Sequence, residues 1–147
     1  MYILVSRCLL GEPCRYDGKS KPVPQVKQLE EQGHILVPVC PEVMGGLKTP
    51  RSPAERQPEG RVVNRDGEDV TSQYVSGAQK TLELAERYGC TCAVLKAKSP
   101  SCGNLQIYDG SFAGRLVQGQ GVTAQMLEEA GVRVWNDDQL ECIEFIK

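Results

Sequence analysis

Four short apolar segments recur along the chain, and stretches with helical periodicity separate them. The segments cover residues 2–5, 35–39, 93–95 and 132–135. Continuous apolar runs of this length are typical of buried strands, and strands that alternate with helices indicate a parallel sheet. We therefore expect an α/β fold: a single domain over residues 1–147, with a three-layer, Rossmann-like open sheet that is mostly parallel and carries a small hairpin.

Apolar residues three or four positions apart, together with capping residues, mark the helical stretches. The expected helices cover residues 24–33, 73–88, 124–130 and 137–144. Glycines at positions 33, 89 and 131 close the first three. For the last three helices, the N-caps are expected at Thr71 or Ser72, at Thr123 and at Asp137.

Proline and glycine interrupt the chain most often over residues 41–60, where the pattern predicts an irregular loop. A loop of this length inside a compact domain is typically functional or disordered. The Asp-Gly pair at 66–67 predicts a small hairpin, or a pair of short extended pieces, over residues 61–70, and the pair at 109–110 predicts a hairpin over residues 105–114.

Three cysteines each follow a different predicted strand. Cys8 comes after the first strand, Cys40 ends the second, and Cys102 lies in the Ser-Pro-Ser-Cys loop after the third. Because parallel strands end at one edge of the sheet, where open α/β folds bind ligands, we expect these thiols to meet there, with Cys14 in the same loop as Cys8. The other cysteines, Cys90, Cys92 and Cys142, fall within apolar patterns and are expected to pack as small hydrophobic residues.

Composition narrows what these thiols can do. The chain has seven cysteines, an odd number, and it starts without the basic and long apolar regions of a signal peptide. We therefore expect a cytoplasmic protein with reduced thiols, in which a cysteine cluster is metal-binding or catalytic. No apolar run is long enough for a membrane helix, and the net charge of −2 gives no support for a nucleic-acid partner.

Three uses of the thiols remain open at this point. A structural zinc site usually takes ligands from closely spaced cysteine pairs, which the chain lacks. An iron–sulfur cluster accepts thiolates from widely separated loops. A cysteine nucleophile would need His34, the only histidine, as its base, but His34 precedes the second strand and so belongs to the opposite edge.

Polar groups accompany the thiols. Glu42, two residues after Cys40, is the first candidate for a general acid or base, and Ser101 could orient water or a substrate oxygen. Gly45, Gly46 and Arg51 offer backbone N–H groups and a guanidinium suited to a planar, polar or anionic ligand. Two lysines, at positions 96 and 98, are expected on one face of the third strand.

Several of these motifs, in this order, resemble the 2-thiouracil desulfurase family. They are Cys-Leu-Leu-Gly at 8–11, Cys-Arg-Tyr-Asp-Gly at 14–18, Cys-Pro-Glu at 40–42, Gly-Gly-Leu at 45–47, Pro-Arg-Ser-Pro at 50–53 and Ser-Pro-Ser-Cys-Gly at 99–103. The resemblance implies a [4Fe-4S] cluster on three cysteines, for which Cys8, Cys40 and Cys102 are chosen, with Cys14 as a possible further ligand. It also implies that Glu42 and Ser101 serve catalysis.

The activity implied by this resemblance is non-redox desulfuration of a thiolated pyrimidine, such as 2-thiouracil, to uracil and sulfide, with the substrate sulfur on an open iron. Two alternatives remain. A sulfur carrier that delivers sulfide to RNA or another acceptor would favour a basic face, and a non-catalytic metal sensor would use four protein ligands, Cys14 included.

Overall fold

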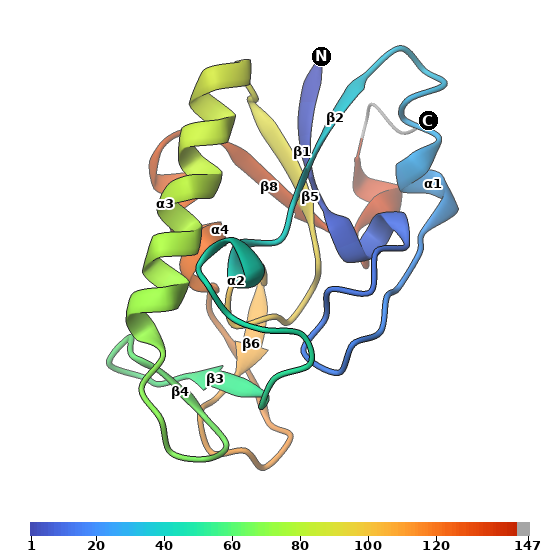
Figure 1. Ribbon diagram of the computed structural model, residues 1–147. Coiled ribbons are helices and arrows are strands. Elements are labelled where there is room, and N and C mark those ends of the chain that lie inside the picture. Colours follow the sequence, from blue (N-terminus) through green and yellow to red (C-terminus); the bar gives the residue numbers. More distant parts are fainter. Residues whose placement is uncertain (144–147) are drawn as a thin grey trace.

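The computed structural model describes residues 1–143, apart from the side chain of Cys142, and its centre is a four-stranded sheet (Figure 1). The strands are β1 (Tyr2–Ser6), β2 (Ile35–Val39), β5 (Cys92–Leu95) and β8 (Arg133–Asn136). They lie in the order β2-β1-β5-β8, and every pair is parallel. The predicted parallel sheet is confirmed.

Helices cover both faces of this sheet. Leu4 of β1 packs in the core shared with α3 (Thr71–Tyr88) and α4 (Val122–Glu129). Its neighbours Ile3 and Val5 point to the other face, against α1 (Pro24–Lys27) and the 3₁₀ turns η1 (Arg7–Leu10) and η2 (Leu140–Cys142). Because alternate residues of a strand face opposite sides, β1 is buried on both, and the three-layer arrangement is confirmed.

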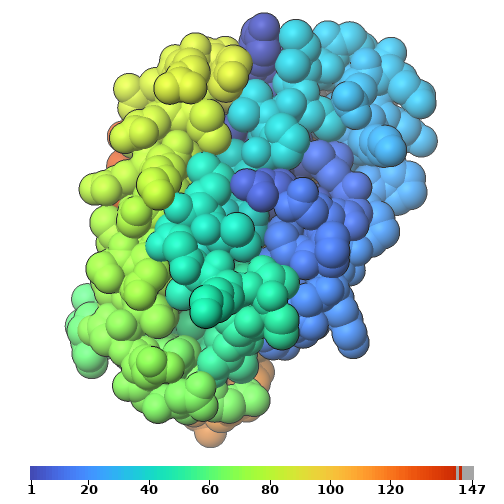
Figure 2. Space-filling view, viewed as in Figure 1, coloured from blue at the N-terminus to red at the C-terminus, as the bar shows by residue number. Residues whose placement is uncertain are grey.

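The predicted irregular loop at 41–60 is wrong, because this segment contains a helix and a strand. The helix α2 (Pro41–Met44) begins with proline at its first position, where no N–H is needed for helical hydrogen bonding. The strand β3 (Ala54–Arg56) pairs antiparallel with β4 (Val62–Asn64). In the space-filling view, the segment after β2 lies between α3 and the N-terminal loop (Figure 2).

The small hairpin or extended pair expected over residues 61–70 is present around its Asp-Gly turn, where Val63 and Asp69 form an antiparallel bridge. The prediction missed that the strand β4 pairs mainly with β3 on its other edge. The second hairpin is confirmed in kind but is longer than predicted. It pairs β6 (Gln106–Tyr108) with β7 (Leu116–Gln118) around a loop over residues 109–115.

Several predicted helix ends are also corrected. Thr71 and Thr123 lie inside their helices instead of capping them, and Val70 and Gly121 hold the cap positions. The helix α1 ends at Lys27, well before the turn at Gly33. The ends of α3 at Gly89 and of α4 just before Gly131 agree with the prediction, and both glycines have a left-handed conformation.

The chain after β5 and β8 differs from expectation too. β5 ends at Leu95, so neither of the two lysines that follow it lies on the strand. Asp137 caps no helix; its carboxylate accepts a hydrogen bond from the N–H of Ala97 instead. Glu144, the expected end of the last helix, lies outside the described residues.

Among the described residues, no helix is long and apolar enough to cross a membrane.

Two glycines allow α2 to lie directly on α3. A Cβ atom at Gly77 of α3 would be 1.8 Å from the carbonyl oxygen of Pro41, and one at Gly45 would be 1.9 Å from that of Gln73. Both contacts are with backbone, so a side chain could fit only if the helices moved apart. This close approach places α2, and with it Cys40 and Glu42, at the carboxyl edge of the sheet.

Replacing Gly77 with alanine tests this contact. In an ordinary helix interior the change would stabilise by about 1 kcal/mol, but here overpacking should lower the free energy of unfolding by about 3 kcal/mol. Urea unfolding monitored by circular dichroism measures it. The control, Gln79→Ala on the exposed face of α3, should stay within about 0.5 kcal/mol of wild type. A Gly77→Ala protein as stable as the control would contradict the packing described.

Candidate functional site

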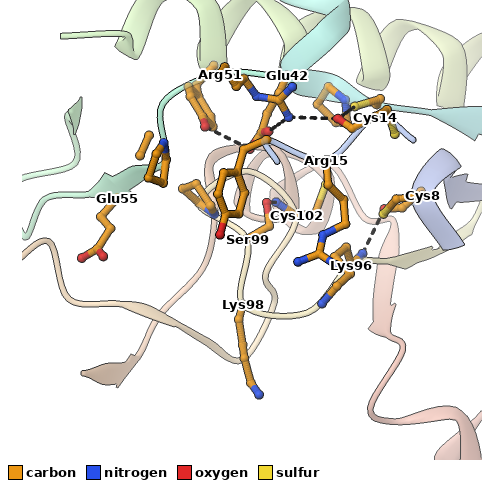
Figure 3. A pocket seen from close by; sticks show the side chains of 18 of the residues that line it. Cys8, Cys14, Arg15, Glu42, Arg51, Glu55, Lys96, Lys98, Ser99 and Cys102 are labelled. Atoms are coloured by element: carbon orange, nitrogen blue, oxygen red, sulfur yellow. Dashed lines mark hydrogen bonds and ion pairs between the residues drawn. The ribbon is translucent and has the colours of Figure 1, made fainter. Parts of the chain in front are cut away.

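A cavity of about 360 Å³ lies at the carboxyl edge of the sheet, a volume in the usual range for small-ligand sites. It is bounded by η1 and the loop after it, by α2 and β3, by residues 96–102, and by the β6–β7 loop. Figure 3 shows the side chains that line it. The expected position of a ligand site, at the ends of the parallel strands, agrees with the location of this cavity.

The four motif cysteines all line the cavity and are all buried. Cys8 comes from η1, Cys14 from the following loop, Cys40 from the end of β2 and Cys102 from the loop after β5. The thiol of Cys40 lies 3.8 Å from the carbonyl oxygen of Cys14. None of the four forms a disulfide. The fold thus brings together thiols that are up to 94 positions apart in the sequence (102 − 8).

The remaining described cysteines lie elsewhere. Cys90 and Cys92, near the start of β5, are buried in the cores on the two faces of the sheet. Burial raises the pKa of both thiols, as expected for small packed hydrophobic groups. The side chain of Cys142 is not among those described.

Burial and neighbouring groups raise the pKa of three of the cavity thiols. The Cys40 thiol lowers the pKa of Cys14, but the Cys8 thiol and burial outweigh it and raise that pKa to about 11. Contact with Cys14, together with burial, raises the pKa of Cys40 strongly. Burial, with the charge of Glu42, raises the pKa of Cys102 to about 12. Thiolates at this position therefore need a cationic partner, and metal binding would release protons.

The donor set fits an iron–sulfur cluster better than a single metal ion. Within the described residues, no three His, Cys, Asp or Glu side chains converge as ligands of one ion. Each cysteine ligand of a cluster bonds a different iron, so the sulfurs surround the group and need not meet at one point. Soft, buried thiols on several walls of one cavity match that requirement.

Glu42 lines the cavity and is held from two sides. The guanidinium of Arg51 forms an ion pair with one carboxylate oxygen, and the hydroxyl of Tyr74 donates to the other at 2.9 Å. The side chains of Glu42 and Arg51 are only 13% and 9% exposed. Burial alone would lower the pKa of Arg51, but Glu42 outweighs it and raises that pKa. Burial, reinforced by Glu42, raises the pKa of Tyr74.

Arg51 also lines the cavity, but its terminal N–H groups are engaged within the protein. One terminal nitrogen donates to the carbonyl oxygen of Cys14 as well as to Glu42, and the other donates to the carbonyl oxygen of Lys48 and the hydroxyl of Thr49, each at 3.1 Å. Figure 3 shows Arg51 beside Glu42 and the Cys14 segment. The guanidinium joins three parts of the chain.

Three other predicted residues lie outside the cavity lining. Gly45 and Gly46 end α2, and Gly45 packs against the α3 backbone. Ser101 is fully buried, with its hydroxyl 2.7 Å from that of Thr123 in α4. The neighbouring Ser99 does line the cavity, and its hydroxyl oxygen accepts two hydrogen bonds from the backbone of the same loop.

Basic side chains outnumber acidic ones in the lining. The cationic residues are Arg7, Arg15, Arg51, Arg65, Lys96 and Lys98, and the carboxylates are Glu42 and Glu55. This excess of positive charge suits thiolates and electron-rich ligands.

Beneath Lys96 lies the buried carboxylate of Asp137, which accepts hydrogen bonds from Lys21 at 2.6 Å and from the N–H of Ala97 at 2.7 Å. Burial would raise the pKa of Asp137, but these partners outweigh it and lower that pKa.

Several lining residues were not identified from the sequence. They include Tyr16, Glu55, Arg65, Tyr74, Ser99, Tyr108 and Phe112. Most of them come from elements other than the cysteine loops, and their spacing carries no signal. For Ser99 a signal existed, because it belongs to the same short motif as Ser101.

The fold and the cavity define an α/β protein with a thiol-lined cavity at the carboxyl edge of a parallel sheet. The sequence profile of the 2-thiouracil desulfurase family matches residues 3–139. The chain belongs to this family.

Two similar proteins extend this finding. An uncharacterized protein of Bacillus subtilis (strain 168), YbbK, is 40% identical and aligns over 96% of this chain and 99% of its own. A solved structure described as the [4Fe-4S]-dependent thiouracil desulfidase TudS is 46% identical, with a TM-score of 0.90 over 95% of this chain and 93% of its own.

Removing the Arg51 guanidinium tests whether this side chain holds together the segments that contain Cys14, Glu42 and Lys48. Arg51→Ala leaves the buried Glu42 carboxylate without its partner, so the free energy of unfolding should fall by about 3 kcal/mol. The control is Arg61→Ala, which removes exposed ion pairs with Glu59 and Asp69 and should cause no measurable change. Chemical unfolding of both variants, without metal, measures the difference. Equal stability of the two would contradict this role for Arg51.

Proposed function

We propose that this protein removes sulfur from a thiolated pyrimidine such as 2-thiouracil, using a [4Fe-4S] cluster bound in the thiol-lined cavity. The observation that carries the proposal is the position of four buried thiols and one ion-paired carboxylate around a single cavity. Family membership and the similarity to TudS support it. Hydrolysis of the carbon–sulfur bond consumes one water, yields uracil and hydrogen sulfide, and transfers no net electrons.

We assign the cluster ligands to Cys8, Cys40 and Cys102, which come from three separate strand ends. The thiols of Cys8 and Cys40 lie close enough to Cys14 to shift its pKa. Cys14 remains the candidate for a fourth ligand or an additional thiol. When bound by three cysteines, the cluster supplies an iron with an open position, a Lewis acid for the substrate sulfur. The basic lining offsets the negative charge of the bound thiolates.

Glu42 is the proposed base. Its carboxylate is fixed at the cavity wall by Arg51 and Tyr74, and each oxygen keeps a further lone pair to accept a proton from water as that water attacks the thiocarbonyl carbon. Ser99 accepts backbone hydrogen bonds, which leaves its O–H free to donate toward the cavity. Ser101, paired with Thr123, acts in this scheme by holding the Cys102 loop.

The test of this function is anaerobic reconstitution with iron and sulfide, followed by incubation with 2-thiouracil. We expect about four irons per chain, as a [4Fe-4S] cluster requires, and loss of the thiocarbonyl absorbance with formation of uracil. An intact cluster without turnover would contradict the substrate assignment and favour sulfur delivery. Bound zinc, or no metal, would contradict the cluster and favour a non-catalytic module.

Single Cys→Ala variants then identify the ligands. The Cys8, Cys40 and Cys102 variants should lose most of their iron, whereas Cys90→Ala, a buried thiol away from the cavity, should keep the wild-type content. EPR of the reduced protein and iron analysis measure both. If Cys14→Ala loses iron while one of the three assigned cysteines does not, the ligand set is a different three of the four.

The base assignment has its own test. Glu42→Gln keeps the shape of the side chain but cannot accept a proton, so kcat should fall at least about 100-fold with unchanged iron content. Glu83→Gln, an exposed carboxylate on α3, is the matched control and should retain full activity. A Glu42→Gln enzyme with the wild-type rate would exclude this residue as the base.

A further inference from the structure

The wall of the cavity opposite the thiols is formed by a lightly anchored segment, the loop of residues 109–115 between β6 and β7. This loop contributes Phe112 and Gly114 to the lining, and Tyr108 at the end of β6 adds a third residue. From position 106 to 118, only Ile107 is buried. A unit with so few buried contacts opens at much lower cost than the sheet does.

One carboxylate holds this loop to the rest of the protein. An oxygen of Glu55, on β3, accepts hydrogen bonds from the backbone N–H groups of Gly110 at 2.9 Å and Phe112 at 3.1 Å. The neighbouring Gln57 donates to the carbonyl oxygen of Gly110 at 3.1 Å. In Figure 3, Glu55 lies across the cavity from Cys8 and Cys14. A charged acceptor shared by two backbone donors makes a stronger attachment than neutral hydrogen bonds would.

Phe112 is held in an unfavourable backbone conformation by this attachment. Its φ is +58°, in the left-handed region that side chains other than glycine and asparagine rarely adopt. The ring is half-buried at the cavity, with the guanidinium carbon of Arg65 5.8 Å from its centroid. A strained aromatic residue in the lining of a cavity is suited to contact with a planar ligand.

We propose that residues 109–115 form a strap over the bound substrate, that Glu55 is the positioning residue that latches it, and that Phe112 is the specificity residue that contacts the pyrimidine ring. The ligand in this inference rests on the proposed function, whereas the latch rests on contacts within the protein. Opening the strap frees the side of the cavity away from the thiols, so substrate enters without disturbing Cys8, Cys40 or Cys102. Closing it places an apolar ring beside the substrate and excludes water from that side.

The latch is tested by amide hydrogen exchange on the metal-free protein. Glu55→Ala should speed exchange at Gly110 and Phe112 about 10-fold, because both lose a charged acceptor. Glu55→Gln keeps an acceptor oxygen and should restore most of the protection. The control, Glu59→Ala, removes an exposed carboxylate paired only with Arg61 among its described contacts and should leave exchange unchanged. Unchanged exchange in Glu55→Ala would overturn the latch.

The substrate-binding role is tested by kinetics of the reconstituted enzyme with 2-thiouracil. Glu55→Ala should raise KM about 10-fold with kcat within about twofold of wild type, the pattern for lost binding without lost chemistry. Phe112→Asn should raise KM similarly while amide exchange stays as in wild type, since asparagine tolerates the left-handed conformation. Faster exchange with unchanged KM would overturn the strap as a substrate-holding element. A wild-type enzyme that does not consume 2-thiouracil would instead contradict the proposed function, whatever the exchange shows.

Discussion

The geometry of the thiol site depends on the buried ion pair between Arg51 and Glu42. Through its other N–H groups, Arg51 holds the carbonyl oxygen of Cys14 and the backbone at Lys48, so one guanidinium connects the N-terminal loop, α2 and the segment after it. Within residues 1–143, no strand pairing connects these parts of the chain. A planar cation with several fixed donors can join them, whereas a lysine could not make the same set of contacts.

Burying the thiols has a chemical consequence. The raised pKa values of Cys14, Cys40 and Cys102 make these thiols poor nucleophiles without a metal, which argues against a mechanism that pairs one of them with a histidine. The position of His34 supports the same conclusion. It lies before β2, at the opposite end of the parallel sheet, where its ring nitrogen is 3.2 Å from the N-terminal amine. The same burial suits thiolates that are neutralised by iron, because the metal replaces the proton.

The two sides of the cavity differ in how firmly they are packed against the rest of the fold. On the thiol side, β1 is buried on both faces and α2 is held against α3 by the contact between Gly45 and Gly77. On the other side, the β6–β7 loop is attached through the hydrogen bonds of Glu55 and Gln57. A rigid wall keeps reactive groups in place, and a lightly attached wall can open for ligand exchange. The fold therefore places the thiols on its firmly packed side and the lightly attached loop on the other.

The sequence by itself determined the parallel sheet and the meeting of the motif cysteines at one edge. Both follow from local rules, since apolar runs form buried strands and parallel strands end on the same side. It did not determine the structure of residues 41–60, because proline and glycine there mark helix starts and close packing as readily as loops. Only the tertiary structure decided which serine lines the cavity, what Arg51 binds and where Phe112 lies. These depend on contacts between distant segments, such as Glu55 with Phe112 and Ser101 with Thr123, for which no spacing in the chain carries a signal.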